Sequence, residues 1–126
     1  MQTILLVDYD PLQAFLRKSV LDRCFNDVCR VSDAAEALCL VEQTRFANDL
    51  ALVITGHLMP GIGGPEFVAE LTARMPHLPV LVLGAPQETA DDYPGAYVCF
   101  RPRSIDSREL MALAVQLAMK HQRTAA

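Results

Sequence analysis

Five short strand-like stretches, each separated from the next by a longer stretch, constrain the fold of this chain most strongly. They cover residues 3–7, 27–31, 50–55, 80–83 and 96–100, and all are apolar runs except 27–31, which carries two charged residues and is expected to be an edge strand. Continuous apolar runs of this length are typical of strands that are buried on both faces of a sheet. Strands that alternate with helices indicate a parallel sheet with helices on both faces, joined by right-handed crossovers.

The stretches between the runs carry signals for the starts of helices. Asp10 precedes a proline, and Asp33 and Asp106 each precede a glutamate by three residues, which is capping-box spacing. The Gly-Gly-Pro sequence at 63–65 opens a further helix. The polar stretch 84–94 leaves room only for a short helix, the fourth in chain order. Four clear helices and one short helix are therefore predicted.

A length of 126 residues fits one domain of this alternating kind. We expect a flavodoxin-like (βα)5 doubly wound parallel sheet with strand order 2-1-3-4-5. The domain is expected to span residues 1–122, with a frayed tail over 123–126. A net charge of −4 disfavours a nucleic-acid surface, and no apolar run is long enough to cross a membrane. The start of the chain does not resemble a signal peptide, so a cytoplasmic domain is expected.

Four cysteines, Cys24, Cys29, Cys39 and Cys99, form no CxxC pair. We interpret them as small buried apolar residues in a reducing compartment. A zinc or redox site is the alternative interpretation.

Four segments together resemble the signature segments of response-regulator receiver domains. They read ILLVDYDP, LVITGHLMPGIGG, PVLVLGAP and FRP, and they match the family in order and spacing over about residues 2–120. The resemblance implies a module of a two-component signalling system. It also implies a site at the carboxyl ends of the strands, which is where ligands bind in such sheets.

The resemblance assigns family roles to five positions, of which only one keeps the family residue. Asp8 matches the first of two adjacent acids that hold Mg²⁺, and Tyr9 stands in place of the second. Gly56 occupies the position of the aspartate that accepts a phosphoryl group. Gly84 replaces a serine or threonine, and Arg101 replaces a lysine that precedes a proline. The family's Lys-Pro peptide implies a cis bond between Arg101 and its proline.

These replacements predict that the site has lost its chemistry. Glycine offers no nucleophile, so no phosphoacceptor and no catalytic residue are expected. Mg²⁺ requires several oxygen ligands, so weak or absent Mg²⁺ binding, and no other cofactor, is expected. Asp10 is interpreted as a helix cap rather than a ligand, and Asp8 as a residual pocket acid that pairs with a cation or backbone amides. His57 is expected to point away from the pocket and to bond the backbone, with partner contact or pH sensing as alternatives.

Three functional hypotheses follow. The first is a non-phosphorylatable receiver that acts through contacts with signalling proteins, either a histidine kinase or an effector domain, or with itself. The second is a receiver regulated by a small ligand or anion, held by Arg101 and by amides near Gly56 in space that Gly56 and Gly84 leave free. The third, an enzyme using Asp8, Tyr9 and His57, is disfavoured because no nucleophile is present. The sequence does not identify the partner, the oligomeric state or any neighbouring domain.

Two helices carry candidate contact surfaces. In the first helix Leu12, Phe15, Leu16 and Val20 are expected to face the core, which leaves Leu21 and the charged Arg17 on the surface. In the last helix the core stripe is expected to be Leu110, Leu113 and Leu117. A second stripe of Met111, Val115 and Met119 is predicted to be a contact surface, with a homodimer through this helix as the favoured arrangement. Cover by neighbouring helices of the same domain is the alternative.

Overall fold

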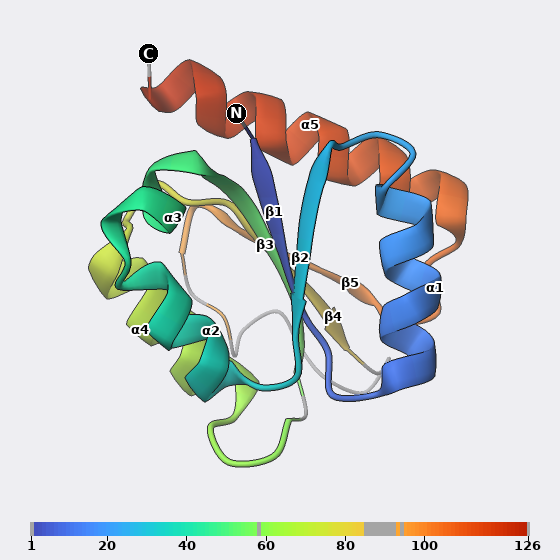
Figure 1. Ribbon diagram of the computed structural model, residues 1–126, viewed down its shortest axis with the longest axis horizontal. Coiled ribbons are helices and arrows are strands. Elements are labelled where there is room, and N and C mark those ends of the chain that lie inside the picture. Colours follow the sequence, from blue (N-terminus) through green and yellow to red (C-terminus); the bar gives the residue numbers. More distant parts are fainter. Residues whose placement is uncertain (1, 58, 85–92, 94, 126) are drawn as a thin grey trace.

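A parallel sheet of five strands in the order β2-β1-β3-β4-β5 forms the centre of the computed structural model (Figure 1). The strands are β1 (Thr3–Val7), β2 (Asp27–Val31), β3 (Leu50–Gly56), β4 (Val80–Gly84) and β5 (Val98–Pro102). The structure describes residues 2–57, 59–84, 93 and 95–125, with side chains described up to residue 120. The predicted flavodoxin-like fold and strand order are confirmed, although β5 begins at Val98 rather than at residue 96.

Helices cover both faces of the sheet (Figure 1). They are α1 (Pro11–Leu21), α2 (Ala34–Val41), α3 (Thr44–Asp49), α4 (Gly64–Arg74) and α5 (Ser107–Ala125). The sequence did not predict α3, which has no buried residue and no side-chain cap and therefore leaves no helical pattern. Helix α5 continues to Ala125, where a frayed tail was expected, and the domain limits stay a prediction. The predicted short helix between β4 and β5 falls outside the described residues.

The capping signals in the sequence are confirmed at three helix starts. Asp10 caps α1 by accepting from the backbone amides of Leu12 and Gln13. Asp33 accepts from the Glu36 amide and Asp106 from the Glu109 amide, each at 2.9 Å. These bonds satisfy amides that a helix start otherwise leaves without partners.

The core consists of two apolar clusters, one on each face of the sheet. Successive strand residues point to opposite faces, so Leu5 and Val7 join α2 and α4 in one cluster, while Ile4 and Leu6 join α1 and α5 in the other. The largest buried side chain, Phe67, fills the first cluster. No helix among the described residues is long and apolar enough to cross a membrane.

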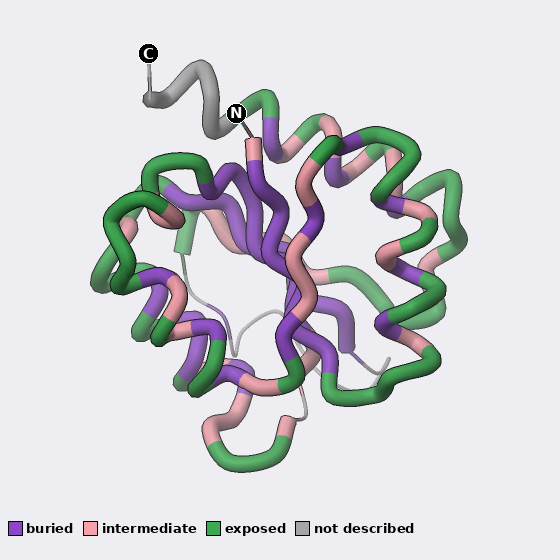
Figure 2. The backbone as a smooth tube through the Cα atoms, viewed as in Figure 1, coloured by how far each residue is buried: buried purple, intermediate pink, exposed green. Residues whose placement is uncertain are grey.

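The orientation of α1 is the reverse of the one predicted. Leu12, Phe15 and Leu16 are 68%, 67% and 57% exposed, and the inward face consists of Ala14, Arg17 and Leu21. Figure 2 shows this helix at one end of the molecule with much of its surface exposed. The Arg17 side chain bonds the buried Asp8, and this contact turns the opposite, apolar face outward.

Helix α5 also packs differently from the prediction. Its buried stripe is Leu110, Ala114 and Ala118, because small residues let the helix lie close to the sheet. Leu113 and Leu117 are only half-buried. Of the predicted contact stripe, Met111 and Val115 are half-buried and Met119 is 48% exposed.

The cysteines do not behave as a group of buried residues. Cys24 and Cys39 are exposed, and Cys29 and Cys99 are half-buried. The expectation of burial was therefore wrong for Cys24 and Cys39.

Candidate functional site

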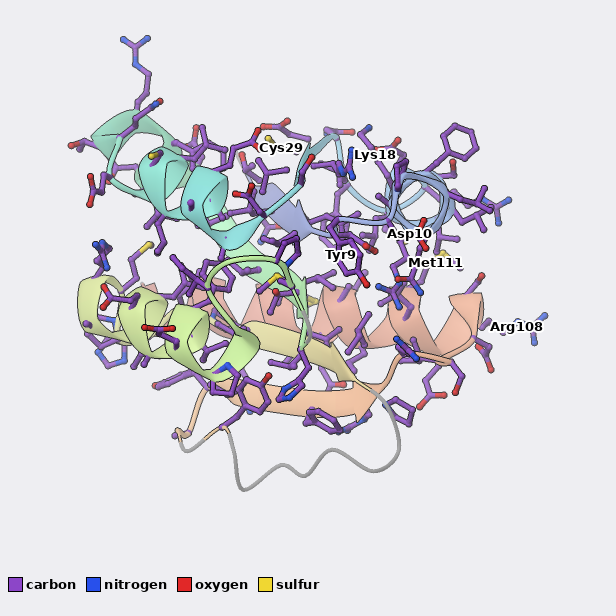
Figure 3. All side chains as sticks on the ribbon, turned by 90° about the horizontal axis from the view of Figure 1, so that it is seen from below. Tyr9, Asp10, Lys18, Cys29, Arg108 and Met111 are labelled. Atoms are coloured by element: carbon purple, nitrogen blue, oxygen red, sulfur yellow. The ribbon has the colours of Figure 1, made fainter. Side chains whose placement is uncertain are left out.

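A cavity of about 240 Å³ lies at the carboxyl ends of β1, β3 and β4. All the predicted pocket residues except Arg101 line it. The lining consists of Val7, Asp8, Tyr9, Asp10, Gln13, Arg17, Gly56, His57, Met59, Leu83, Gly84 and Arg103. Figure 3 shows Tyr9 and Asp10 where the chain passes from β1 to α1. The order of the strands thus brings together segments that are far apart in the sequence, as the position of the predicted site requires.

The Asp8 carboxylate is buried, with 5% of its surface exposed, and both of its oxygens accept hydrogen bonds. Oδ1 accepts from the backbone amide of Asp10 at 3.0 Å, and Oδ2 accepts from Nη1 of Arg17 at 3.1 Å. The backbone oxygen of Asp8 accepts from Nε and Nη2 of Arg30 at 3.1 and 2.7 Å. Asp8 therefore pairs with a cation and a backbone amide.

The Arg17 guanidinium connects two parts of the chain that flank the cavity. Nη1 forms the buried ion pair with Asp8, and Nη2 donates to the backbone oxygen of Arg103 at 3.1 Å. Burial lowers the pKa of the Arg17 guanidinium, and the charge and hydrogen bond of Asp8 oppose this effect. Arginine nevertheless stays protonated in proteins. Arg17 is thus a fixed positive charge beside the pocket acid.

Gln13 completes this polar cluster. In the orientation that satisfies both neighbours, its amide nitrogen donates to Oδ2 of Asp8 at 3.3 Å and its oxygen accepts from Nη2 of Arg17 at 3.2 Å. Arg17 was predicted to lie on the surface, and Gln13 and Arg103 were not among the predicted site residues. One signal was available, since Ala14, Arg17 and Leu21 recur at helical spacing and form an alternative inward face.

The donor groups at this site do not fit Mg²⁺. Mg²⁺ prefers octahedral oxygen ligands, and the one buried carboxylate is already engaged by Arg17 and a backbone amide. A phenol at Tyr9 and a bare backbone at Gly56 stand where the family has two further acids. Within the described chain, no group of three or more histidine, cysteine, aspartate or glutamate residues is arranged to hold a metal ion.

His57 is among the residues that line the cavity, and its ring bonds a side chain that was not predicted as its partner, whereas its expected bond to the backbone stays a prediction. Its Nδ1 forms a short hydrogen bond with the hydroxyl of Tyr93, and the two rings lie edge to face with centroids 5.5 Å apart. Tyr93 is buried and stacks on Phe100 of β5 at 6.1 Å. A chain of aromatic contacts therefore joins the cavity to β5.

Arg101 lies outside the cavity, which corrects its predicted place in the pocket. It is exposed, and its Nη1 donates to the backbone oxygen of Phe100 at 2.8 Å. Arg101 still pairs within the sheet, opposite Leu83, whereas Arg103 follows the end of β5 and reaches the cavity. The predicted cis bond between Arg101 and Pro102 was also wrong, since no peptide bond in the described ranges is cis.

The ends of β3 and β4 offer the cavity no nucleophile. Gly56 and Gly84 carry no side chain. The neighbouring hydroxyl of Thr55 is buried and donates to the backbone oxygen of Gly56 at 3.1 Å. The arrangement holds an ion pair and leaves an open space, and the position that the family uses as phosphoacceptor carries no side chain.

Comparison with known proteins agrees with this arrangement of strands. The family model described as the response regulator receiver domain matches residues 4–96. No curated protein matches the chain.

Solved structures resemble the whole chain. A response regulator receiver domain protein from Clostridium thermocellum is 21% identical with a TM-score of 0.82, and 100% of each chain is covered. A two-component transcriptional regulator AraC from Clostridium phytofermentans is 16% identical with a TM-score of 0.83, covering 99% of this chain and 98% of that chain. The receiver domain of the hybrid histidine kinase CckA is 25% identical with a TM-score of 0.76, covering 92% and 98%.

Proposed function

The chain belongs to the response-regulator receiver family of two-component signalling, and from that premise we propose that it works without phosphorylation, as a protein-interaction module. It acts by presenting a surface to a signalling partner, and it catalyses no reaction. The partner is a histidine kinase, an effector domain or a second copy of the chain.

The end of β3 carries this proposal. In the family alignment that the sequence motifs define, the phosphoacceptor position is Gly56, and Gly56 lines the cavity as a bare backbone. Phosphoryl transfer requires a nucleophile in line with the phosphorus and a metal ion to neutralise charge. Gly56 supplies no nucleophile at that position, and the Asp8 carboxylate is already engaged by Arg17 and the Asp10 amide.

The contacts around the cavity support a fixed state rather than a switch. The Asp8–Arg17 pair joins the end of β1 to the middle of α1, and Arg17 also bonds the segment after β5. A serine or threonine hydroxyl is missing at Gly84, so an incoming charge would have no donor there. The rings of His57, Tyr93 and Phe100 contact one another in series, and these contacts begin at the cavity lining.

The test is phosphorylation by acetyl phosphate with Mg²⁺, read by intact-mass spectrometry, with an ordinary receiver domain as the positive control. We expect the ordinary receiver to gain a phosphoryl group and this protein to remain unmodified. A modified species of this protein would overturn the proposal. If that species survives dilute base, the His57→Gln variant shows whether the imidazole carries the phosphoryl group.

A small anion in the cavity is a second candidate function. The observation that favours it is the presence of Arg103 among the residues that line the cavity, together with Gly56 and Gly84. Arg103, not the predicted Arg101, would be the binding cation. Calorimetric titration with inorganic phosphate and with acetate tests this function. Binding that Arg103→Gln abolishes and Arg101→Gln leaves intact would support it.

A further inference from the structure

The cavity at the strand ends contains a cation that has no bonding partner in the described part of the chain. Among the charged residues of the lining, Asp8 and Arg17 are buried and pair with each other, and Asp10 caps α1. Arg103 is exposed, and its side chain makes no hydrogen bond or ion pair with another residue that the structure describes. Its guanidinium is therefore free to bind a ligand.

The backbone of Arg103 is held at the edge of this cavity. Its amide donates to the backbone oxygen of Gly84 at 2.7 Å, and its own oxygen accepts from Nη2 of Arg17 at 3.1 Å. Burial lowers the pKa of the Arg17 guanidinium, Asp8 opposes this effect, and the charge of Arg103 adds to it. The Arg103 guanidinium therefore lies within electrostatic range of Arg17. It is a second positive charge at the cavity, whereas the first is already paired with Asp8.

Tyr9 adds an aromatic ring to the same lining. It is 52% exposed and lies in the segment between β1 and α1 (Figure 3). An aromatic ring of this kind offers a face or an edge to a second ring. Val7, Met59 and Leu83 contribute apolar groups to the lining, and the sulfur of methionine also favours contact with aromatic rings. The lining thus suits a ligand that carries both a ring and an acidic group.

Charge and volume restrict the ligand further. The charged residues of the described lining are Asp8, Asp10, Arg17 and Arg103, so their charges cancel. A dianion such as phosphate near pH 8 would meet two carboxylates, whereas a planar monocarboxylate can form two parallel hydrogen bonds with one guanidinium. The cavity volume of about 240 Å³ is below the roughly 300–1,000 Å³ of pockets that hold drug-sized ligands. The ligand is therefore a small monoanion.

We propose that the cavity binds a small aromatic monocarboxylate, with its carboxylate on the Arg103 guanidinium and its ring against the ring of Tyr9. The replaced family positions agree with this ligand. Tyr9 and Gly56 stand where the family has acids, and an acid at either position would repel a carboxylate. The inference rests on the second candidate function proposed above, because it names the class of anion that the cavity takes.

Calorimetric titration of the purified protein with benzoate, cyclohexanecarboxylate, acetate and inorganic phosphate tests the class of ligand. We expect benzoate to bind about tenfold more tightly than acetate, which has the carboxylate without the ring. Cyclohexanecarboxylate is the matched control, because its ring is apolar but not aromatic. It should bind about threefold more weakly than benzoate. Phosphate should bind more weakly than benzoate.

Variants of the two binding residues test their roles. Arg103→Gln should weaken benzoate binding about tenfold or more, because a charge-assisted hydrogen bond is lost. Arg101→Gln is the matched control, since Arg101 is an exposed arginine of β5 outside the cavity lining, and it should leave the affinity unchanged. Tyr9→Leu should weaken benzoate about fivefold and leave acetate unchanged, whereas Tyr9→Phe should keep the parent affinity. Circular dichroism checks that each variant is folded.

The results separate this inference from the functions on which it builds. Benzoate that binds no more tightly than acetate, cyclohexanecarboxylate or phosphate, or that Tyr9→Leu does not weaken, would overturn the aromatic ligand and leave a general anion site. A protein that binds none of the four anions up to about 10 mM would overturn the anion site as well. Neither result bears on the acetyl phosphate experiment, which tests the absence of phosphorylation separately.

Discussion

The Arg17 guanidinium on α1 lies 3.1 Å from the carboxylate of Asp8, which follows β1, and both side chains are buried. A cation from the protein's own helix therefore sits on the acid that the family uses for a metal ion. The pair is held at both ends, because Arg17 also bonds the backbone oxygen of Arg103 and Asp8 also accepts from the Asp10 amide. We regard this ion pair as the main support for the proposal that the domain works without a phosphorylation switch.

Replacing Arg17 with methionine should destabilise the fold strongly. Asp8 would keep its charge in a buried place without its cation, and breaking such a buried pair costs about 3–5 kcal/mol in the free energy of unfolding. Urea denaturation of the parent and of the Arg17→Met variant measures this difference. The matched control is Lys18→Met, which removes the exposed pair with Asp22 and should cost about 1 kcal/mol or less.

The double variant Asp8→Asn with Arg17→Met separates the pair from simple loss of packing. With the charge of residue 8 removed, the loss of Arg17 no longer leaves an unpaired ion, so the double variant should be more stable than Arg17→Met alone. If the effects of Asp8→Asn and Arg17→Met on the free energy of unfolding are additive, the ion pair contributes no stability of its own.

Mg²⁺ binding should be weak in the parent, with a dissociation constant above about 1 mM, because one engaged carboxylate is a poor site for this ion. Tyr9→Asp together with Gly56→Asp restores the two missing acids and should raise the affinity. Adding Arg17→Gln should raise it further, since the cation that competes for Asp8 is then gone. Calorimetric titration of the parent, the double and the triple variant measures the series. A triple variant that binds no more tightly than the double variant would argue against competition by Arg17.

The fold could be predicted from the sequence because the sequence features that indicate it are local. Apolar runs and helix caps are formed by residues that are near one another along the chain, and the site residues Asp8, Gly56 and Gly84 were placed by the resemblance of the strand-end segments to the receiver family. The buried ion pair of Arg17 with Asp8 could not be predicted in this way. Helix α1 offers two possible inward faces, and the apolar face is the expected one unless the buried Asp8, which follows β1, is taken into account.

Two other features of the site also depend on contacts between distant segments. His57 bonds Tyr93, which follows β4 in the sequence, and no local pattern indicates this partner. Arg101 was assigned to the pocket from its motif. Because β5 extends to Pro102, Arg101 lies within the sheet, and Arg103 lines the cavity instead. Contacts between distant segments decide both cases, and only the folded chain shows them.

Alkylation of the cysteines should distinguish Cys29 from the two exposed thiols. Burial raises the pKa of the Cys29 thiol, and the neighbouring charges of Asp27 and Glu36 raise it further. A higher pKa means a smaller fraction of reactive thiolate near pH 8, so Cys29 should react about tenfold more slowly than Cys24 or Cys39 with iodoacetamide. Peptide mass spectrometry over a time course measures the rates. A Cys29 that is modified as fast as Cys24 would contradict the burial of β2 in this structure.

Gly64, at the start of α4, should tolerate no side chain. A Cβ built there would overlap the Tyr93 hydroxyl and lie 2.7 Å from the backbone oxygen of His57, so the His57–Tyr93 contact or the helix would have to move. We expect Gly64→Ala to lower the free energy of unfolding by about 2–3 kcal/mol, the cost of overpacking a tight site.

Gly63 provides the matched control for this prediction, because it precedes Gly64 and a Cβ there meets nothing within 4 Å. Its backbone is in the extended region with φ of −72°, so alanine brings no strain. Gly63→Ala should cost about 1 kcal/mol or less, since alanine is only a poorer helix cap than glycine. Tyr93→Phe in the Gly64→Ala background removes the overlapping hydroxyl and should recover part of the lost stability. If Gly63→Ala and Gly64→Ala lower the free energy of unfolding equally, the close contacts of Gly64 with His57 and Tyr93 do not limit the side chain at this position.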